Sequence, residues 1–172
     1  HFLILGVRSS SDDVTTYEVK STQPLALCPR CYSPRAADHG PYCGACGAEL
    51  PEDLPQHPIL LAEESEDSGR FATTSRLLAL KLGHPAIILP ITVFAETAFG
   101  VTRFYQIEPM IESKPDVVSG LSYQPTELLS WGADLAEGLN YLHEKEVVFD
   151  TVDRSRVLVD EAGAHWLCFE GI

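Results

Sequence analysis

The alternation of hydrophobic and polar positions along the chain predicts a series of short strands. Residues 14–20 alternate throughout, residues 2–7 are mostly apolar, and the polar run 8–13 between them is typical of a turn. These segments predict a β-hairpin at the start of the sequence. Further strands are expected at residues 59–62, 87–94, 100–107, 156–159 and 165–169, with an acidic loop at 63–67 and turns at 96–98 and 160–163.

Two segments carry apolar side chains at the spacing of an amphipathic helix. The first, residues 71–82, is rich in leucine and is expected to end at Gly83, because glycine is common just after a helix. The second covers residues 127–142. Its apolar stripe is expected at Leu128, Gly132, Leu135, Leu139 and Leu142, which follow one another at helical intervals. Strands grouped around two helices predict the α+β fold class.

Four of the five cysteines form two pairs, each with two residues between its members. Cys28 with Cys31 and Cys43 with Cys46 are separated by the segment 32–42. A turn of this kind places two thiolates on one side of a tight loop, and two such turns complete a tetrahedral four-sulfur site. The sequence therefore predicts a structural zinc ion with no open position for water or substrate. Two disulfides are the alternative, and the paired spacing disfavours them.

The segment that holds these cysteines, residues 27–50, is expected to be a zinc ribbon. It is too short to build an apolar core of its own, so zinc should supply most of its local stability. Gly44 and Gly47 are expected to let the second pair turn. The proline-rich connector 51–58 marks the end of the ribbon.

Composition restricts the partners and the compartment. The chain has 12 basic and 25 acidic residues, a net charge of −13, and no run of basic side chains, which disfavours binding to nucleic acid. No stretch approaches the roughly 20 apolar residues of a membrane-spanning helix. Cysteines at metal-ligand spacing suit a reducing compartment, so a cytoplasmic location is expected.

The order of several short motifs resembles the protein kinase fold. The motifs are the end of helix C with the following turn Gly83-His84-Pro85-Ala86-Ile87-Ile88, strand five entering the hinge at residues 105–109, the end of helix E at 138–145, and the strands around the catalytic loop at 157–160 and from Leu167 onward. The resemblance runs from about residue 71 to residue 172 and extends more weakly to the first hairpin.

This resemblance implies a kinase-like small lobe plus the start of a large lobe, with the zinc ribbon inserted between the second and third strands. Residues 1–26 would form the first hairpin of the small lobe, 27–50 the ribbon, 57–110 the rest of the small lobe, and 111–172 a partial large lobe. A kinase fold normally continues beyond this point. The apolar face of helix 127–142 would then be covered by a missing segment, by a partner or by a second copy.

The positions that carry out phosphoryl transfer in protein kinases are not matched. The family needs a glycine-rich loop, a lysine paired with a glutamate, a catalytic aspartate, and Asn and Asp ligands for magnesium. Here Ser10, Ser11, Asp12 and Asp13 occupy the loop, residues 59–63 contain no lysine, and Thr73, Thr74 and Ser75 stand where the glutamate belongs. Thr151 replaces the catalytic aspartate, Arg156 the asparagine and Phe169 the magnesium-binding aspartate.

The resemblance therefore implies a pseudokinase, which is not an enzyme and is not expected to bind ATP. Such a module would regulate or scaffold signalling by binding a protein partner or other domains of the same polypeptide. The alternative is an atypical kinase or nucleotide-dependent transferase that uses Asp150 and Glu170, each one residue away from a catalytic position. A zinc-ribbon protein that binds nucleic acid is a third reading, and the acidic charge counts against it.

Overall fold

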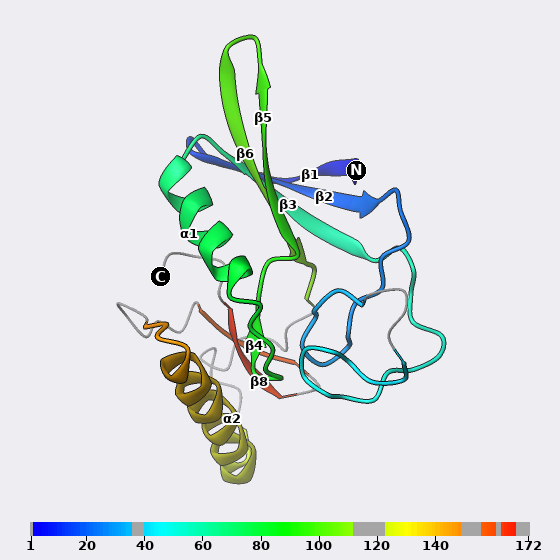
Figure 1. Cartoon of the computed structure of the whole chain (residues 1–172), viewed down its shortest axis with the longest axis vertical. Helices are drawn as coiled ribbons and strands as arrows, with labels where there is room; N and C mark the ends of the chain where they lie inside the picture. Colours follow the sequence, from blue (N-terminus) through cyan, green and yellow to red (C-terminus); the bar gives the residue numbers. More distant parts are fainter. Residues whose placement is uncertain (1, 36–39, 112–122, 149–155, 161–162, 168–172) are drawn as a thin grey trace.

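The computed structural model describes residues 2–35, 40–111, 123–148, 156–160 and 163–167. The fold class is α+β, as predicted, and the described residues form a five-stranded antiparallel sheet, a smaller three-stranded sheet and two helices (Figure 1). The elements are β1 (Phe2–Ser10), β2 (Val14–Ser21), β3 (Ile59–Ser65), α1 (Ser68–Ala79), β4 (Ile87–Ile88), β5 (Thr92–Ala98), β6 (Val101–Pro109), α2 (Pro125–Glu144), β7 (Val157–Val159) and β8 (Ala164–Leu167).

The larger sheet has the strand order β1-β2-β3-β6-β5, and the predicted hairpin of β1 and β2 forms one edge of it. Helix α1 covers one face of β5 and β6, where the rings of Phe71 and Phe104 lie 4.8 Å apart (Figure 1). The opposite face carries an apolar core built around Val19, Leu60 and Ile107, each at most 1% exposed. Successive side chains of a strand therefore alternate between the face that packs against α1 and the face that carries this core.

Strand β3 is longer than the sequence predicted, and the acidic loop at 63–67 was wrong in its first three residues. Residues 63–65 continue the ladder and pair with β2 on one side and β6 on the other. Their carboxylates are tolerated there because each has a cation within reach: Glu63 pairs with Arg70, and Glu64 with Arg103. Glu64 also accepts a hydrogen bond from the Tyr17 hydroxyl at 3.1 Å.

The predicted strand 87–94 is split between the two sheets. Residues 87–88 form β4, which pairs in parallel with β8, whereas β5 begins only at Thr92 and pairs with β6. The turn between β5 and β6 was expected at residues 96–98 and lies instead at Phe99 and Gly100, with φ values of 52° and 81°. Two positive φ angles are typical of the tightest hairpin turns.

Both ends of α1 differ from the prediction. The helix begins at Ser68 because Asp67 caps it: the Asp67 carboxylate accepts hydrogen bonds from the amides of Gly69 and Arg70, at 2.8 and 3.2 Å. It ends at Ala79, and the left-handed position after it is taken by Lys81, with φ of 50°, rather than by Gly83.

Helix α2 buries a stripe that is rotated from the one predicted. It starts with a capping box formed by Gln124 and Glu127. Its buried residues are Trp131, Gly138 and Leu142, while Leu128 and Gly132 of the predicted stripe are exposed. The indole of Trp166 in β8 packs closely against this face, because a Cβ at Gly138 would lie 3.0 Å from it.

The second sheet joins α2 to the rest of the molecule. Its order is β4-β8-β7, and β7 with β8 confirms the last predicted hairpin as far as the described residues reach, since Phe169 lies outside them. A second core lies where α1, β4 and α2 meet, and its buried members are Leu77, Leu82, Ile87, Leu142 and Val147.

Candidate metal centre

The segment between β2 and β3 contains two turns with the same backbone hydrogen bonds. In the first turn the Tyr32 amide donates to the Cys28 carbonyl at 2.9 Å, and the Cys28 amide donates to the Ser33 carbonyl at 3.0 Å. In the second turn the Gly47 and Cys43 amides make the equivalent bonds, at 2.9 and 2.7 Å. We call these turns the first and second knuckle. Each closes on itself without help from the other.

The two knuckles bring all four predicted cysteines together. Their sulfur atoms lie within 4.8 Å of one another, and the closest pairs are Cys31 with Cys43 at 3.7 Å and Cys28 with Cys46 at 3.8 Å. All four are free thiols, so disulfides, the alternative to a metal site, are not formed. Zn–S bonds of about 2.3 Å in a tetrahedron place the sulfurs about 3.8 Å apart, so this donor set fits a zinc-sized ion.

Three thiols of the cluster have shifted pKa values, and the shifts differ in direction. A hydrogen bond from Cys31 lowers the pKa of the Cys28 thiol to about 5, and donating that bond, followed by burial, raises the pKa of Cys31. Burial also raises the pKa of the Cys46 thiol. One thiolate is therefore ready to bind a cation, whereas Cys31 and Cys46 must release protons as the metal binds. Metal affinity should fall as the pH falls.

Apolar packing around the sulfurs is thin. Besides the cysteines, the buried members of this core are Ala26, Leu50 and Leu54. The segment also contacts the rest of the fold at Gly83, where a Cβ would lie 2.4 Å from the Ala45 carbonyl oxygen. Gly83 is therefore required for close packing against the second knuckle. The sequence predicted only that Gly83 ends the helix, and not this contact.

Replacement of Gly83 by alanine is expected to lower the free energy of unfolding by about 1–3 kcal/mol, because backbone must move to admit the methyl group. Chemical denaturation monitored by circular dichroism measures this change. Gly132→Ala is the matched control: it lies in the exposed part of α2 with nothing within 4 Å of a Cβ, and it should stabilise the helix by up to about 1 kcal/mol. A Gly83→Ala protein as stable as the parent would contradict the packing described.

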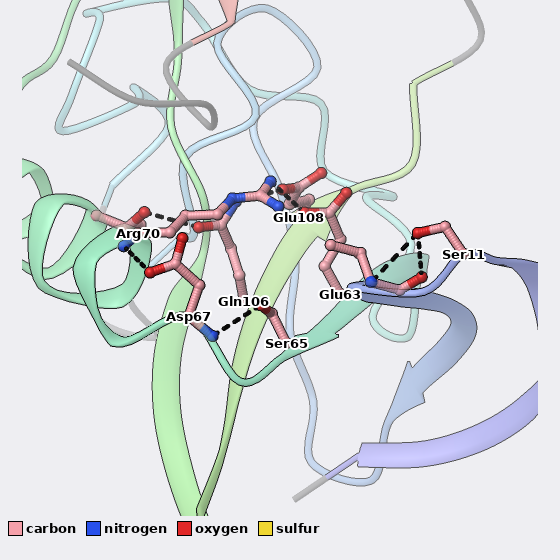
Figure 2. A network of polar contacts seen from close by, with 9 residues as sticks. Ser11, Glu63, Ser65, Asp67, Arg70, Gln106 and Glu108 are labelled. Atoms are coloured by element: carbon pink, nitrogen blue, oxygen red, sulfur yellow. Dashed lines mark hydrogen bonds and ion pairs between the residues drawn. The ribbon is translucent and has the colours of Figure 1, made fainter.

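A second cluster of polar side chains lies between α1 and the large sheet. Arg70 reaches from α1 to the carboxylate of Glu63 on β3, and Gln106 and Glu108 of β6 lie beside it (Figure 2). The hydroxyl of Thr74, a residue 2% exposed, donates to the Gln106 amide oxygen at 2.7 Å. The cavity left beside this network is about 20 Å³, which is room for a single water molecule.

The sequence identified some of these positions and missed the pairing. The sequence comparison placed Thr74 among the residues that stand where the family's helix glutamate belongs, and residues 59–63 on the strand that lacks the lysine. It did not predict the ion pair between Glu63 and Arg70. Arg70 was read as preceding the helix, so nothing in the pattern pointed it toward β3. The residues matched to the kinase catalytic positions, Thr151, Phe169 and the alternatives Asp150 and Glu170, lie outside the described residues.

No known protein family matches this sequence, and no curated protein is significantly similar to it. Among the described residues, neither helix is long and apolar enough to cross a membrane. The metal centre and the polar network are therefore interpreted from their own chemistry.

Proposed function

We propose that this chain is a catalytically inactive, kinase-like module that carries a structural zinc ribbon and acts by binding a protein. The observation that carries the proposal is the inverted ion pair under α1. Protein kinases place a lysine on the third strand, where it binds phosphates and pairs with a glutamate of helix C. In this chain the charges are exchanged, with Glu63 on the third strand and Arg70 on the following helix.

The exchange of charge opposes phosphoryl transfer. Glu63 is paired with Arg70, and the third strand has no lysine to attract nucleotide phosphates as the family's lysine does. Thr74, one of the three residues that stand where the family's glutamate belongs, is committed to the hydrogen bond with Gln106. The larger cleft outside Arg70, about 600 Å³, is lined by more carboxylates than cations, so most of its charged groups repel phosphates.

Topology supports the kinase-like part of the proposal. Three antiparallel strands in chain order are followed by a helix that packs on the same sheet, and the next hairpin, β5 and β6, inserts beside β3. In this scheme residues 1–26 and 57–110 belong to the small lobe and residues 111–172 begin the large lobe. Residues 27–50 are the inserted ribbon, and zinc held by the four cysteines would cross-link its two knuckles.

The proposed partner is a protein, or another domain of the same polypeptide. The net charge of −13 disfavours nucleic acid and anionic lipid surfaces. Reduced thiols at the metal centre favour a reducing compartment such as the cytoplasm. Regulation or scaffolding in signalling is the role that an inactive kinase-like module can fill through its surface alone.

Thermal unfolding with and without ATP and magnesium tests the loss of nucleotide binding. A ligand present at 100 times its dissociation constant stabilises a fold by about 2.7 kcal/mol. We expect no change in the melting temperature of the zinc-loaded chain, because the third strand has no lysine to bind the phosphates. An active protein kinase in the same buffer is the control. A magnesium-dependent increase in the melting temperature would contradict the proposal and support the alternative that uses Asp150 and Glu170. The double variant Asp150→Asn, Glu170→Gln would then test that alternative, because it should lose the increase.

A further inference from the structure

Tyr32 has a backbone conformation that is unfavourable for a side chain of its size. It follows Cys31 in the first knuckle with φ of 57°, and the matching position of the second knuckle is Gly47, with φ of 73°. The hydrogen bonds of the two turns are equivalent. Glycine adopts this left-handed conformation at no steric cost, whereas a residue with a Cβ does not. The turn alone therefore favours glycine at position 32.

The side chain of Tyr32 connects the first knuckle to the β7–β8 hairpin. Its hydroxyl donates to Oδ2 of Asp160 at 2.6 Å, and Asp160 is only 6% exposed. The other carboxylate oxygen, Oδ1, accepts the Gly163 amide at 3.1 Å and lies 3.0 Å from Nε2 of His165. The Tyr32 and His165 rings also meet edge to face, with their centroids 6.4 Å apart.

The connection continues through the buried ring of His165. Its Nδ1 lies 2.8 Å from the Pro85 carbonyl oxygen, which can only accept a hydrogen bond. Its Nε2 faces the Asp160 carboxylate, so the ring bridges that carboxylate to the Pro85 carbonyl. The neighbouring Trp166 amide donates to the Ala86 carbonyl at 2.8 Å. Removing the Tyr32 hydroxyl would take one of its hydrogen-bond donors from the buried Asp160 carboxylate.

We infer that Tyr32 is a positioning residue that couples metal binding at the four cysteines to the order of the β7–β8 hairpin. Closure of the first knuckle around a metal fixes the backbone of Tyr32, and its hydroxyl then holds Asp160 and, through it, His165. Coupling between two sites is reciprocal, so a looser hairpin must also weaken metal binding by the same factor. The inference requires a metal at the cysteines and does not depend on the proposed kinase-like function.

The test compares the zinc-loaded chain with its Tyr32→Phe variant. Backbone hydrogen exchange is measured at the Asp160 and Trp166 amides, which bond to the carbonyls of Gly163 and Ala86. We expect exchange about tenfold faster or more at both amides in the variant, since a hydrogen bond to a charged group is lost, and unchanged exchange in β3 and β6. Zinc affinity, measured by competition with a chromophoric chelator, should fall by the same factor.

Two further variants make the test specific. Tyr42→Phe changes the other tyrosine of the segment, which is 59% exposed, and should alter neither the hairpin nor zinc binding. Tyr32→Gly relieves the backbone of the first knuckle, yet it should loosen the hairpin as Tyr32→Phe does. Hairpin amides that stay protected in either Tyr32 variant would overturn the inference. So would a loosened hairpin in Tyr32→Phe at unchanged zinc affinity, because the hydrogen bond would then carry no coupling.

Discussion

Removal of the bound metal is expected to unfold the segment between β2 and β3. Apart from the cysteines, the buried residues of its core are Ala26, Leu50 and Leu54 in the part of the segment that the structure describes. Apparent binding free energies of structural zinc in small peptides are on the order of 10–16 kcal/mol, far more than three small apolar contacts provide. A strong chelator, or Cys31→Ser, should therefore abolish the local order of residues 24–57.

The measurement is hydrogen exchange across the chain, combined with the zinc content of the purified protein. Cys168→Ser, which changes the fifth cysteine, is the control and should leave zinc content unchanged. Because the segment contacts Gly83 and Asp160, the melting temperature of the remaining fold should also fall. A chelated protein in which residues 24–57 stay protected would contradict a structural metal. Loss of the segment alone, with the rest melting as before, would show that its contacts with Gly83 and Asp160 do not stabilise the rest of the fold.

Truncation of Leu142 to alanine is expected to lower the free energy of unfolding by about 2–5 kcal/mol. This side chain is fully buried where α1, β4 and α2 meet, and its neighbours there include Leu77 and Ile87. Those elements cannot all move inward to fill the space. The variant therefore loses the transfer free energy of the removed atoms and also bears the cost of the cavity that remains. Urea denaturation of both proteins measures the difference.

Leu129→Ala provides the matched control on the same helix. Leu129 is 75% exposed, and its truncation should change stability by no more than about 0.5 kcal/mol. Equal effects of the two substitutions would mean that α2 is rotated about its axis relative to the orientation described. A large effect at Leu142 alone would support the buried stripe formed with Trp131 and Gly138.

The features predicted from the sequence are those that local chemistry determines. The β1–β2 hairpin follows from alternation next to a polar turn, and the four cysteines follow from their paired spacing, because each knuckle is built from neighbouring residues. Helix α2 was found for the same reason. Which of its leucines are buried was not found, because the residues that cover the helix, such as Trp166 against Gly138, are far away in the chain.

The misses share a physical cause: a distant partner or an unfavourable backbone outweighed the local signal. Glu63 and Glu64 were predicted to lie in a loop because the sequence pattern does not indicate that Arg70 and Arg103 are their ion-pair partners. The β5–β6 turn was misplaced because Phe99, rather than asparagine or glycine, takes the first left-handed position. The kinase resemblance remains a proposal, since no known family matches the sequence and Thr151 and Phe169 lie outside the described part of the chain.

The position of the knuckles between β2 and β3 also affects the chain entropy of folding. Pairing of β2 with β3 must close the loop of residues 22–58. A metal that ties residue 28 to residue 46 removes about half of that loop from the closure. Since the entropic cost changes by only about 0.6 kcal/mol for each factor of two in length, the metal speeds or stabilises this strand pairing very little. The metal therefore acts on the rest of the fold through the contacts of the segment with Gly83 and Asp160, and the sheet can form with the loop still open.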